Sequence, residues 1–209
     1  MTATVDHNST HDTRVRLLDA AGKVFAEHGF EQATIRDICA IAAANVASVK
    51  YHFGGKTELY RATMRHFRAT AEERIPESAP PDAEPAERLR AYIRRAIYLI
   101  LDQGPESVHG RLMAWEMTKP TPALDDHVEE VVRPMAGELR EIVLALSPGL
   151  DEQAARAMMG SIIGQVLFYK HSRPVLEKLF PGQPTDAEAF ERLAEHITSF
   201  SLRGLGVEG

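Results

Sequence analysis

Hydrophobic positions recur along this chain with the spacing of helix faces. In the first such segment, Leu17, Ala21, Val24 and Phe25 lie on one side of a helix, and Gly29 is a natural place for that helix to stop. No stretch alternates hydrophobic and polar residues with a period of two. The pattern therefore predicts an all-α protein.

The same reasoning predicts about nine helices. Thr34 is expected to cap a short second helix, and Asn45 a third that runs to about His52. A fourth runs from about Lys56 towards Arg74, and a helix over 122–147 must kink near Pro134. The other helices are expected over 17–28, 86–103, 106–118, 151–172 and 186–203.

Breaks in the pattern divide the chain into parts. Residues 1–11 and 204–209 are expected to be tails, and the proline-rich segment 76–85 is expected to be a connector. We expect an N-terminal head over 12–57, with a motif of two short helices at about 34–53, and a C-terminal domain over 58–203.

Charge separates the first part from the rest. The chain of 209 residues has a formal net charge of −6, yet residues 12–68 carry nine Lys or Arg and six Asp or Glu. A basic segment on an acidic protein favours a polyanionic partner for that segment, although chance unevenness is the alternative.

Other features of composition point to a cytoplasmic protein. The one cysteine, Cys39, leaves no intrachain disulfide, which fits a reducing compartment. The N-terminal segment lacks the apolar core of a signal peptide, and the longest nearly apolar stretch, 158–169, is too short to cross a membrane. We expect no membrane partner.

Segment 34–53 has the lengths of a helix-turn-helix. When Val49 and Phe53 point inward, the exposed face of the second helix carries small apolar groups beside a lysine and a tyrosine. Such a face suits the major groove, where methyl groups meet thymine and polar groups meet bases or phosphates. The DNA-contacting residues expected from the segment and its flanks are Thr34, Arg36, Asn45, Val46, Ala47, Ser48, Lys50, Tyr51, His52 and Lys56.

Some of these residues are expected to bind phosphate. Thr34 and Lys56 stand at helix N-termini, where free N–H groups favour an anion, and Arg36, Arg14 and Arg16 add positive charge. The alternative for each is an ordinary solvated surface residue.

Segment 17–60, LLDAAGKVFAEHGFEQATIRDICAIAAANVASVKYHFGGKTELY, resembles the DNA-binding head of the tetracycline-repressor (TetR) family. RLMAWEMTKPTPALD (111–125) and GSIIGQVLFYKHSRPVLEKLFP (160–181) are similar to its CecR-like subgroup. The resemblance implies a homodimeric transcriptional regulator with a three-helix DNA-binding head and a ligand-sensing helical C-terminal domain.

The chain departs from the family pattern in the head. Ala43 stands where a turn glycine is common, which predicts a strained or different turn. Gly55 replaces the usual Ser or Thr cap, and Lys50 replaces a common tyrosine, so the operator sequence is not implied. Cys39 occupies a position where a small apolar residue is expected, and we interpret it as buried and inert, with redox sensing as the alternative.

Two apolar helices in the C-terminal part fit the family's dimer interface. Segment 154–169 is apolar almost all round and includes small residues that permit close helix packing. The alternative is that both helices pack only within one subunit. The expected interface residues are Gly160, Ser161, Gly164, Phe190, Leu193, Ile197 and Phe200.

A sensing pocket for an unidentified, mostly apolar small molecule is expected between two helices. Glu116 lies in an apolar run and either binds a cationic or hydrogen-bonding ligand or pairs with an arginine such as Arg140. Core packing is the alternative for the Met and Trp side chains. The expected lining is Arg111, Met113, Trp115, Glu116, Met117, Met158, Gln165, Phe168, Tyr169 and His171.

Catalytic motifs are absent from the sequence. It has no G-x-S-x-G, HExxH or CxxC motif and no glycine-rich phosphate loop, and we expect no cofactor and no metal site. We therefore predict a dimeric regulator of transcription that represses from a palindromic operator and is released by a ligand. The alternatives are a helical small-molecule-binding dimer without DNA binding and an α-helical enzyme that uses Glu116 and a histidine.

Overall fold

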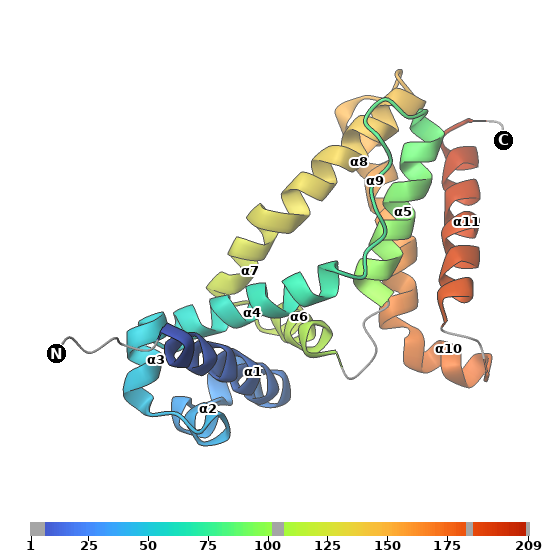
Figure 1. Ribbon diagram of the computed structural model, residues 1–209. Helices are drawn as coiled ribbons and strands as arrows, with labels where there is room; N and C mark the ends of the chain where they lie inside the picture. Colours follow the sequence, from blue (N-terminus) through green and yellow to red (C-terminus); the bar gives the residue numbers. More distant parts are fainter. Residues whose placement is uncertain (1–6, 102–106, 183–185, 208–209) are drawn as a thin grey trace. The chain divides into compact units, whose positions relative to one another are not determined.

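The computed structural model describes residues 7–101, 107–182 and 186–207, and these residues form helices without a strand (Figure 1). This confirms the all-α prediction. The elements are α1 (His7–Gln32), α2 (Ile35–Ala42), α3 (Val46–Phe53), α4 (Lys56–Glu72), α5 (Pro85–Leu101), α6 (Val108–Thr118), α7 (Pro122–His127), the π-helical η1 (Val128–Val132), α8 (Arg133–Leu146), α9 (Glu152–His171), α10 (Arg173–Leu179) and α11 (Ala187–Gly204).

The chain forms two compact units. Unit 1 comprises residues 1–73 and 104–127, and unit 2 comprises residues 74–103 and 128–209. The head expected over 12–57 lies within unit 1, which also contains α4, α6 and α7.

Unit 1 is built around α1, which packs against α2, α4 and α6. Leu17, Phe25, Ile38 and Leu59 are fully buried in its core. Gly22 permits the approach of α4, because a Cβ at this position would lie 2.1 Å from a ring carbon of Phe67. The helix-turn-helix is thus packed against α1 and α4, and α6 packs on the same two helices.

The helical backbone of α1 is interrupted at Gly29, where φ is 72°. The predicted stop therefore appears as a break, with a further helical turn to Gln32. Trp115 of α6 lies against Gly29, and its indole Nε1 donates a hydrogen bond to the carbonyl of Ala26 at 3.2 Å. A side chain from α6 thus satisfies a backbone acceptor beside the break.

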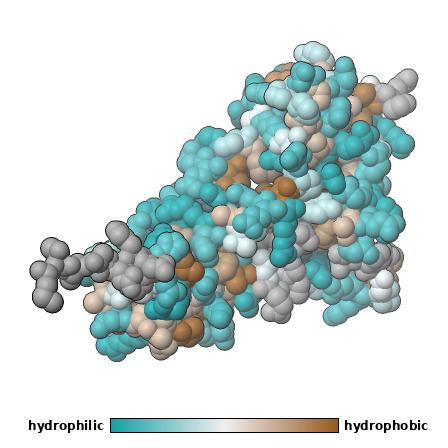
Figure 2. Space-filling model, viewed as in Figure 1, coloured by the Kyte–Doolittle hydropathy of each residue, from teal (hydrophilic) through white to brown (hydrophobic). Residues whose placement is uncertain are grey.

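Unit 2 is a bundle in which α5 packs against α8, α9 and α11. Its core includes the fully buried Ile93, Ile97, Ile142 and Val166. The surface of α5 is linked to α11 by arginine–glutamate pairs, which are described below. No helix in the described part of the chain is long and apolar enough to span a membrane. On the face shown in Figure 2, hydrophobic residues appear as separate patches among hydrophilic ones.

The irregularity expected near Pro134 is present, and one helix was missed. The expected helix over 122–147 is divided into α7, η1 and α8, with Pro134 in the first turn of α8. Proline has no N–H and its ring crowds the preceding turn, so a regular α-helix cannot continue through it unchanged. Helix α10 was not expected, because no element was predicted between the helices over 151–172 and 186–203.

At the N-terminus, α1 begins at His7, inside the segment expected to be a tail. Residues 1–6 and 208–209 of the expected tails lie outside the described residues, as do 102–106, where two expected helices end and begin.

Candidate functional site

The helix-turn-helix of unit 1 is held by side-chain caps. The Thr34 hydroxyl accepts a hydrogen bond from the N–H of Asp37, and the Asn45 side chain accepts one from the N–H of Ala47 at 2.9 Å. Both caps confirm the predictions from sequence. Cys39 is buried in this motif, and burial raises the pKa of its thiol, as expected of an inert cysteine.

The turn between α2 and α3 carries local strain. Ala43 has φ 48° and ψ 47°, and it is the one non-glycine residue with positive φ in the described part of the chain. A left-handed conformation costs an alanine about 1–2 kcal/mol, which glycine avoids. The strained turn expected at this position is therefore present.

Helix α3 separates buried from exposed side chains as the sequence predicts. Val49 and Phe53 are buried, whereas Tyr51 is 80% exposed and Val46 48% exposed. Ala47 and Lys50 are also exposed, and Ser48 and His52 are half-buried. Exposed apolar and aromatic groups on so short a helix form a surface suited to a partner.

The residues expected to bind phosphate differ in their freedom to do so. Lys56 is turned towards α1: its Nζ donates to the carbonyl of Glu31 at 3.1 Å and lies 4.7 Å from the Phe30 ring centroid. Burial lowers the pKa of Lys56, and the charge of Glu31 partly offsets that effect. Arg36 is exposed on α2, whereas the Thr34 hydroxyl already donates to Asp37 at 2.6 Å.

Two further arginines lie beside the motif on α1. The guanidinium of Arg14 lies 5.3 Å from the ring centroid of Phe53. Arg16 donates to the carbonyl of Ala42 and forms an ion pair with Asp12. Both therefore help to hold α1 against the motif.

The expected pocket residues are divided between the units. Those on α6 belong to unit 1: Met113 packs against the core, Met117 is 56% exposed, and the buried Nε of Arg111 has no hydrogen-bond partner among the described residues. The remaining expected lining residues, all on α9 of unit 2, are Met158, Gln165, Phe168, Tyr169 and His171.

On α9 these side chains have different surroundings. Met158 and Tyr169 pack against the core of unit 2, which matches the alternative that they are core residues. Phe168 is 53% exposed and His171 is exposed. Gln165 donates to the Ser201 hydroxyl of α11 at 3.4 Å.

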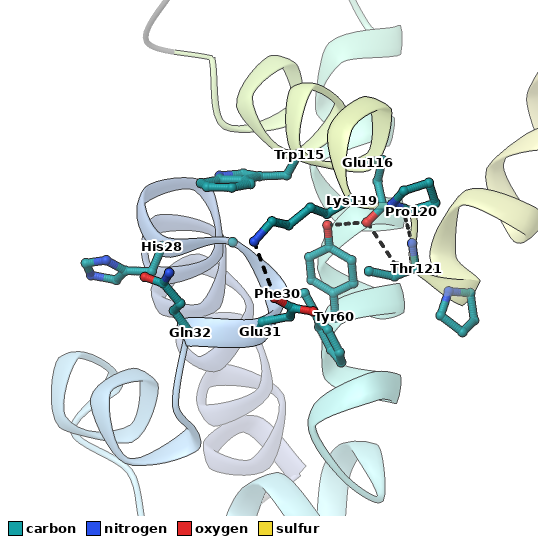
Figure 3. A pocket seen from close by; sticks show the side chains of 12 residues that line it. His28, Phe30, Glu31, Gln32, Tyr60, Trp115, Glu116, Lys119, Pro120 and Thr121 are labelled. Atoms are coloured by element: carbon teal, nitrogen blue, oxygen red, sulfur yellow. Dashed lines mark hydrogen bonds and ion pairs between the residues drawn. The ribbon is translucent and has the colours of Figure 1, made fainter.

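A cavity of about 220 Å³ lies within unit 1 (Figure 3). Trp115 and Glu116 are the two expected pocket residues among its lining. The others were not predicted, because they come from α1, α4 and the segment after α6: His28, Gly29, Phe30, Glu31, Gln32, Tyr60, Lys119, Pro120, Thr121 and Pro122.

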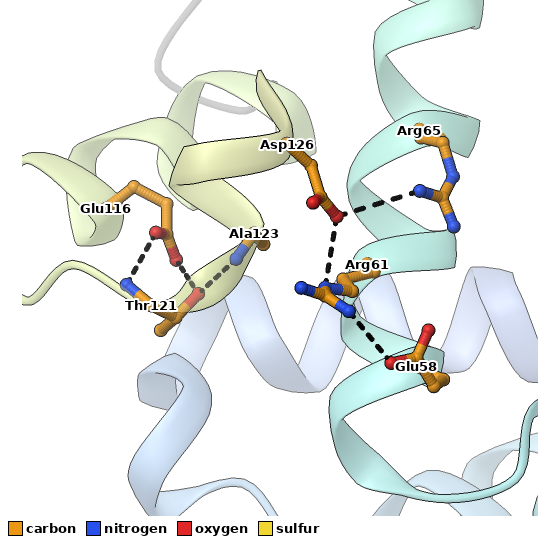
Figure 4. A network of polar contacts seen from close by, with 7 residues as sticks. All are labelled: Glu58, Arg61, Arg65, Glu116, Thr121, Ala123 and Asp126. Carbon is orange, nitrogen blue, oxygen red and sulfur yellow. Dashed lines mark hydrogen bonds and ion pairs between the residues drawn. The ribbon is translucent and has the colours of Figure 1, made fainter. Parts of the chain in front are cut away.

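Glu116 is fully buried at this cavity and accepts three hydrogen bonds (Figures 3 and 4). The Tyr60 hydroxyl donates to Oε1 at 2.7 Å, the Thr121 hydroxyl donates to Oε1 at 2.9 Å, and the Thr121 N–H donates to Oε2 at 2.9 Å. Burial, with the hydrogen bond to Glu116, strongly raises the pKa of Tyr60, so the phenol remains a donor.

The suggested pairing of Glu116 with Arg140 is wrong. Arg140 instead forms an ion pair with Glu152 at 2.7 Å. The distance along the sequence between Glu116 and a candidate partner did not show which residue would contact it.

Beside Glu116, a charged network links α4 to α7 (Figure 4). Asp126 Oδ2 lies 3.0 Å from Nε of Arg61 and 3.8 Å from Nη1 of Arg65. Arg61 also donates to Glu58 at 3.0 Å. Asp126 and Glu58 therefore balance the charges of Arg61 and Arg65. None of these contacts was predicted from the sequence.

The expected interface residues fall into two groups. Gly160, Ser161 and Gly164 are exposed on α9, and Phe200 of α11 is 60% exposed. In contrast, Phe190 and Ile197 are buried in the core of unit 2, so these two belong to the interior of one subunit, and Leu193 packs partly against the same core. The amphipathic stripe of α11 is explained by its own unit, because α5 covers it.

Metal ligands do not gather in the described part of the chain: no three His, Cys, Asp or Glu side chains are placed to hold an ion.

The capped helix pair, its strained turn and the exposed face of α3 define a helix-turn-helix protein with an all-helical remainder. The domain family described as "Bacterial regulatory proteins, tetR family" matches residues 17–63. The family "HTH-type transcriptional dual regulator CecR, C-terminal domain" matches residues 85–205. The chain therefore belongs to the TetR family of transcriptional regulators, with a CecR-type C-terminal domain, and is a DNA-binding regulator.

Relatives cover most of the chain. It is 28% identical to the HTH-type transcriptional dual regulator CecR of Shigella flexneri, over 88% of this chain and 86% of that protein. It is 26% identical to the HTH-type transcriptional repressor NicS of Pseudomonas putida, over 92% of both. The solved structure of AibR in complex with isovaleryl coenzyme A and operator DNA has the same fold, with a TM-score of 0.63, 22% identity and coverage of 90% of this chain and 97% of that one.

Proposed function

We propose that this regulator acts as a homodimer that places α3 of each subunit in the major groove of a pseudo-palindromic operator, represses transcription there, and is released by a small, mostly apolar effector. The observation that carries the proposal is the exposed face of α3, on which Val46, Ala47, Lys50 and Tyr51 all point to solvent. A solvated helix gains nothing from an exposed tyrosine and valine, whereas a DNA groove gives both a contact.

Each residue of this face has a role in the proposal. Val46 and Ala47 present methyl groups to thymine, and Lys50 reaches a guanine acceptor or a phosphate. The Tyr51 hydroxyl donates to a phosphate or base edge. Arg36 adds an exposed charge at α2, while the uncapped N-terminus of α4 offers free N–H groups to a phosphate.

Dimerisation is assigned to α9 and α11. On α9, the exposed Gly160, Ser161 and Gly164 let a second helix approach closely, and on α11 the ring of Phe200 is 60% exposed. A two-fold dimer repeats one head on each half of a palindrome, which doubles the contacts of a motif that binds weakly alone.

Release by an effector is inferred from the family. The AibR structure holds both an acyl-coenzyme A and operator DNA, and NicS is named a repressor. An effector that relieves repression must bind the DNA-free state better, because equal affinity for both states shifts nothing.

The operator assignment is tested with DNA recovered by sequencing the genomic fragments that the protein retains. Lys50→Ala and Tyr51→Ala should each weaken binding to that DNA by about 1–3 kcal/mol, with little change in melting temperature, because both side chains are exposed. Lys178→Ala, an exposed lysine of α10, is the matched control and should bind as wild type. If both α3 variants bind as tightly as the control, α3 does not read the operator.

The dimer is tested by sedimentation at micromolar concentration. The wild type should sediment as a dimer, and Gly164→Leu should weaken it by about 1–3 kcal/mol, the usual cost of overpacking a tight contact. Gly137→Leu, an exposed glycine of α8, is the control for a bulky leucine at the surface. A monomeric wild type would remove this part of the proposal.

A further inference from the structure

The cavity of unit 1 has walls of a particular chemistry. Three of its lining residues are aromatic: Phe30, Tyr60 and Trp115. Two more, Glu31 and Glu116, are carboxylates, against which the lining offers one ammonium group, that of Lys119. We propose that this cavity, which includes Trp115 and Glu116 of the expected sensing pocket, is a binding site for a small organic ammonium ion.

Glu116 gives the cavity a buried carboxylate without a cation. Its three hydrogen bonds come from the neutral groups of Tyr60 and Thr121, and no Lys, Arg or His of the described residues forms an ion pair with it. A buried carboxylate is costly unless it is paired as well as hydrogen-bonded. A cation in the adjacent cavity supplies the missing charge, and the low local dielectric strengthens the attraction.

The aromatic rings favour the same kind of ligand. Cations are attracted to the faces of Trp, Tyr and Phe within about 6 Å of the ring centroid. The structure already shows one such contact at this place, since the Lys56 ammonium lies 4.7 Å from the Phe30 ring centroid. The Tyr60 ring is buried against Phe30 and Phe25, with ring centroids 5.1 and 4.8 Å away, so the partly buried rings of Trp115 and Phe30 are the ones that an organic cation would meet.

The Glu31–Lys119 ion pair crosses the cavity in Figure 3, with Nζ 3.4 Å from Oε2. The side chains are 73% and 57% exposed, and pairs as exposed as this one contribute little stability. An incoming ammonium ion can therefore take the place of Lys119 at Glu31 at low cost. Lys119 acts as an internal competitor for the ligand.

The size of the cavity limits the ligand. About 220 Å³ is less than the 300–1,000 Å³ typical of drug-sized ligands. The ligand is thus a small amine with one hydrophobic group rather than a nucleotide-sized molecule.

The test uses Trp115, the only tryptophan of the chain and part of the cavity wall, as a fluorescence reporter. The full-length protein is titrated with 2-phenylethylamine at neutral pH, and with two probes of matched shape, the neutral 2-phenylethanol and the anionic 3-phenylpropionate. The amine should shift the fluorescence and saturate. The alcohol should bind about tenfold more weakly, as expected for the loss of about 1.4 kcal/mol of cation contacts, and the acid more weakly still.

Variants locate the site. Glu31→Gln should weaken amine binding several-fold, whereas Glu27→Gln, an exposed glutamate of the same helix outside the cavity, should not. Lys119→Met should tighten amine binding, because it removes the competing ammonium group. Glu116→Gln should also weaken amine binding. If this variant does not fold, the variants at the exposed Glu31 and Lys119 test the proposal.

The proposal is overturned if the amine gives no saturable change at millimolar concentration, if the alcohol binds as tightly as the amine, or if Glu31→Gln behaves like Glu27→Gln. Operator affinity is measured in a separate assay with Lys50→Ala, so failure of the cation site and failure of the proposed DNA binding are told apart.

Discussion

A buried glutamate in unit 1 and two exposed ion pairs in unit 2 show two different uses of charged side chains. In unit 1, Glu116 is fully buried and accepts hydrogen bonds from Tyr60 and Thr121. In unit 2, Arg90 and Arg94 of α5 reach Glu195 and Glu191 of α11 at 2.9 and 2.7 Å, and all four side chains are more than two-fifths exposed.

The difference shows that distance alone does not measure the importance of a polar contact. The exposed pairs of unit 2 are as short as the bonds to Glu116, but water and salt screen them and a lost partner is replaced by water. A donor left without Glu116 finds a replacement less easily, because Tyr60 and Glu116 are buried. Stability should therefore depend on a few polar groups in unit 1 and on many weak ones in unit 2.

The largest expected effect is that of Glu116→Ala. It leaves the Tyr60 hydroxyl and the Thr121 N–H without their acceptor and opens a cavity, and the free energy of unfolding should fall by about 3 kcal/mol. Denaturant unfolding measures this, with Glu195→Ala of unit 2 as the matched glutamate. Equal losses in the two variants would erase the contrast between the units.

Alkaline pH should reveal Tyr92, the buried tyrosine of unit 2. Burial, with the nearby charge of Glu138, raises the pKa of Tyr92 to about 12 from 10. The folded state therefore keeps a proton that the unfolded chain releases, and stability is lost as pH rises from about 10 to 12, by about 2–3 kcal/mol. Between pH 10 and 12, the free energy of unfolding should fall less steeply with pH for Tyr92→Phe than for wild type. The same pH dependence in both proteins would contradict the assignment.

Tyr60→Phe should have an intermediate effect at neutral pH. It removes the hydroxyl that donates to Glu116 but keeps the ring that packs against Phe25 and Phe30, and should cost about 1–2 kcal/mol. Thermal melts at low and high salt measure it. The loss should be the same at both, because the contact is buried, and a loss that disappears in salt would show it to be exposed.

Arg94→Met should have the smallest effect. The pair with Glu191 is largely solvated, so its removal should cost less than about 1 kcal/mol, and high salt should remove even that. The same melts provide the measurement, and a salt-independent loss would mean that the methylene stem of Arg94 matters more than its charge.

Local signals in the sequence were sufficient for most of the fold. Thr34 and Asn45 cap their helices as their residue types predict, and the inward positions Val49 and Phe53 follow from helix geometry. Helix α10 escaped prediction because it is short and has proline at its start, where the same residues also end helices. Caps and periodicity depend on neighbours within one turn, and so they can be read from one chain.

The surroundings of Glu116 include a contact that no local pattern contains. Its polarity within an apolar run marked it as unusual, but Tyr60 is 56 residues away in the chain. Likewise, the stripe of Phe190 and Ile197 shows that α11 is covered on one side, and the sequence cannot tell whether its own subunit or a second copy provides the cover. Pattern predicts that a face is buried; only the fold identifies its partner.

The break in α1 has a consequence for amide hydrogen exchange. The break separates Phe30–Gln32 from the regular helix of α1, and in this last turn Glu31 forms an ion pair with Lys119, the C-cap residue of α6. Protection of a helix end follows the element that holds it. The last turn of α1 should therefore exchange in step with α6, while the part of α1 before Gly29 exchanges with the helix-turn-helix. A single helix would then belong to two cooperative opening units, and its glycine would mark where one ends and the other begins.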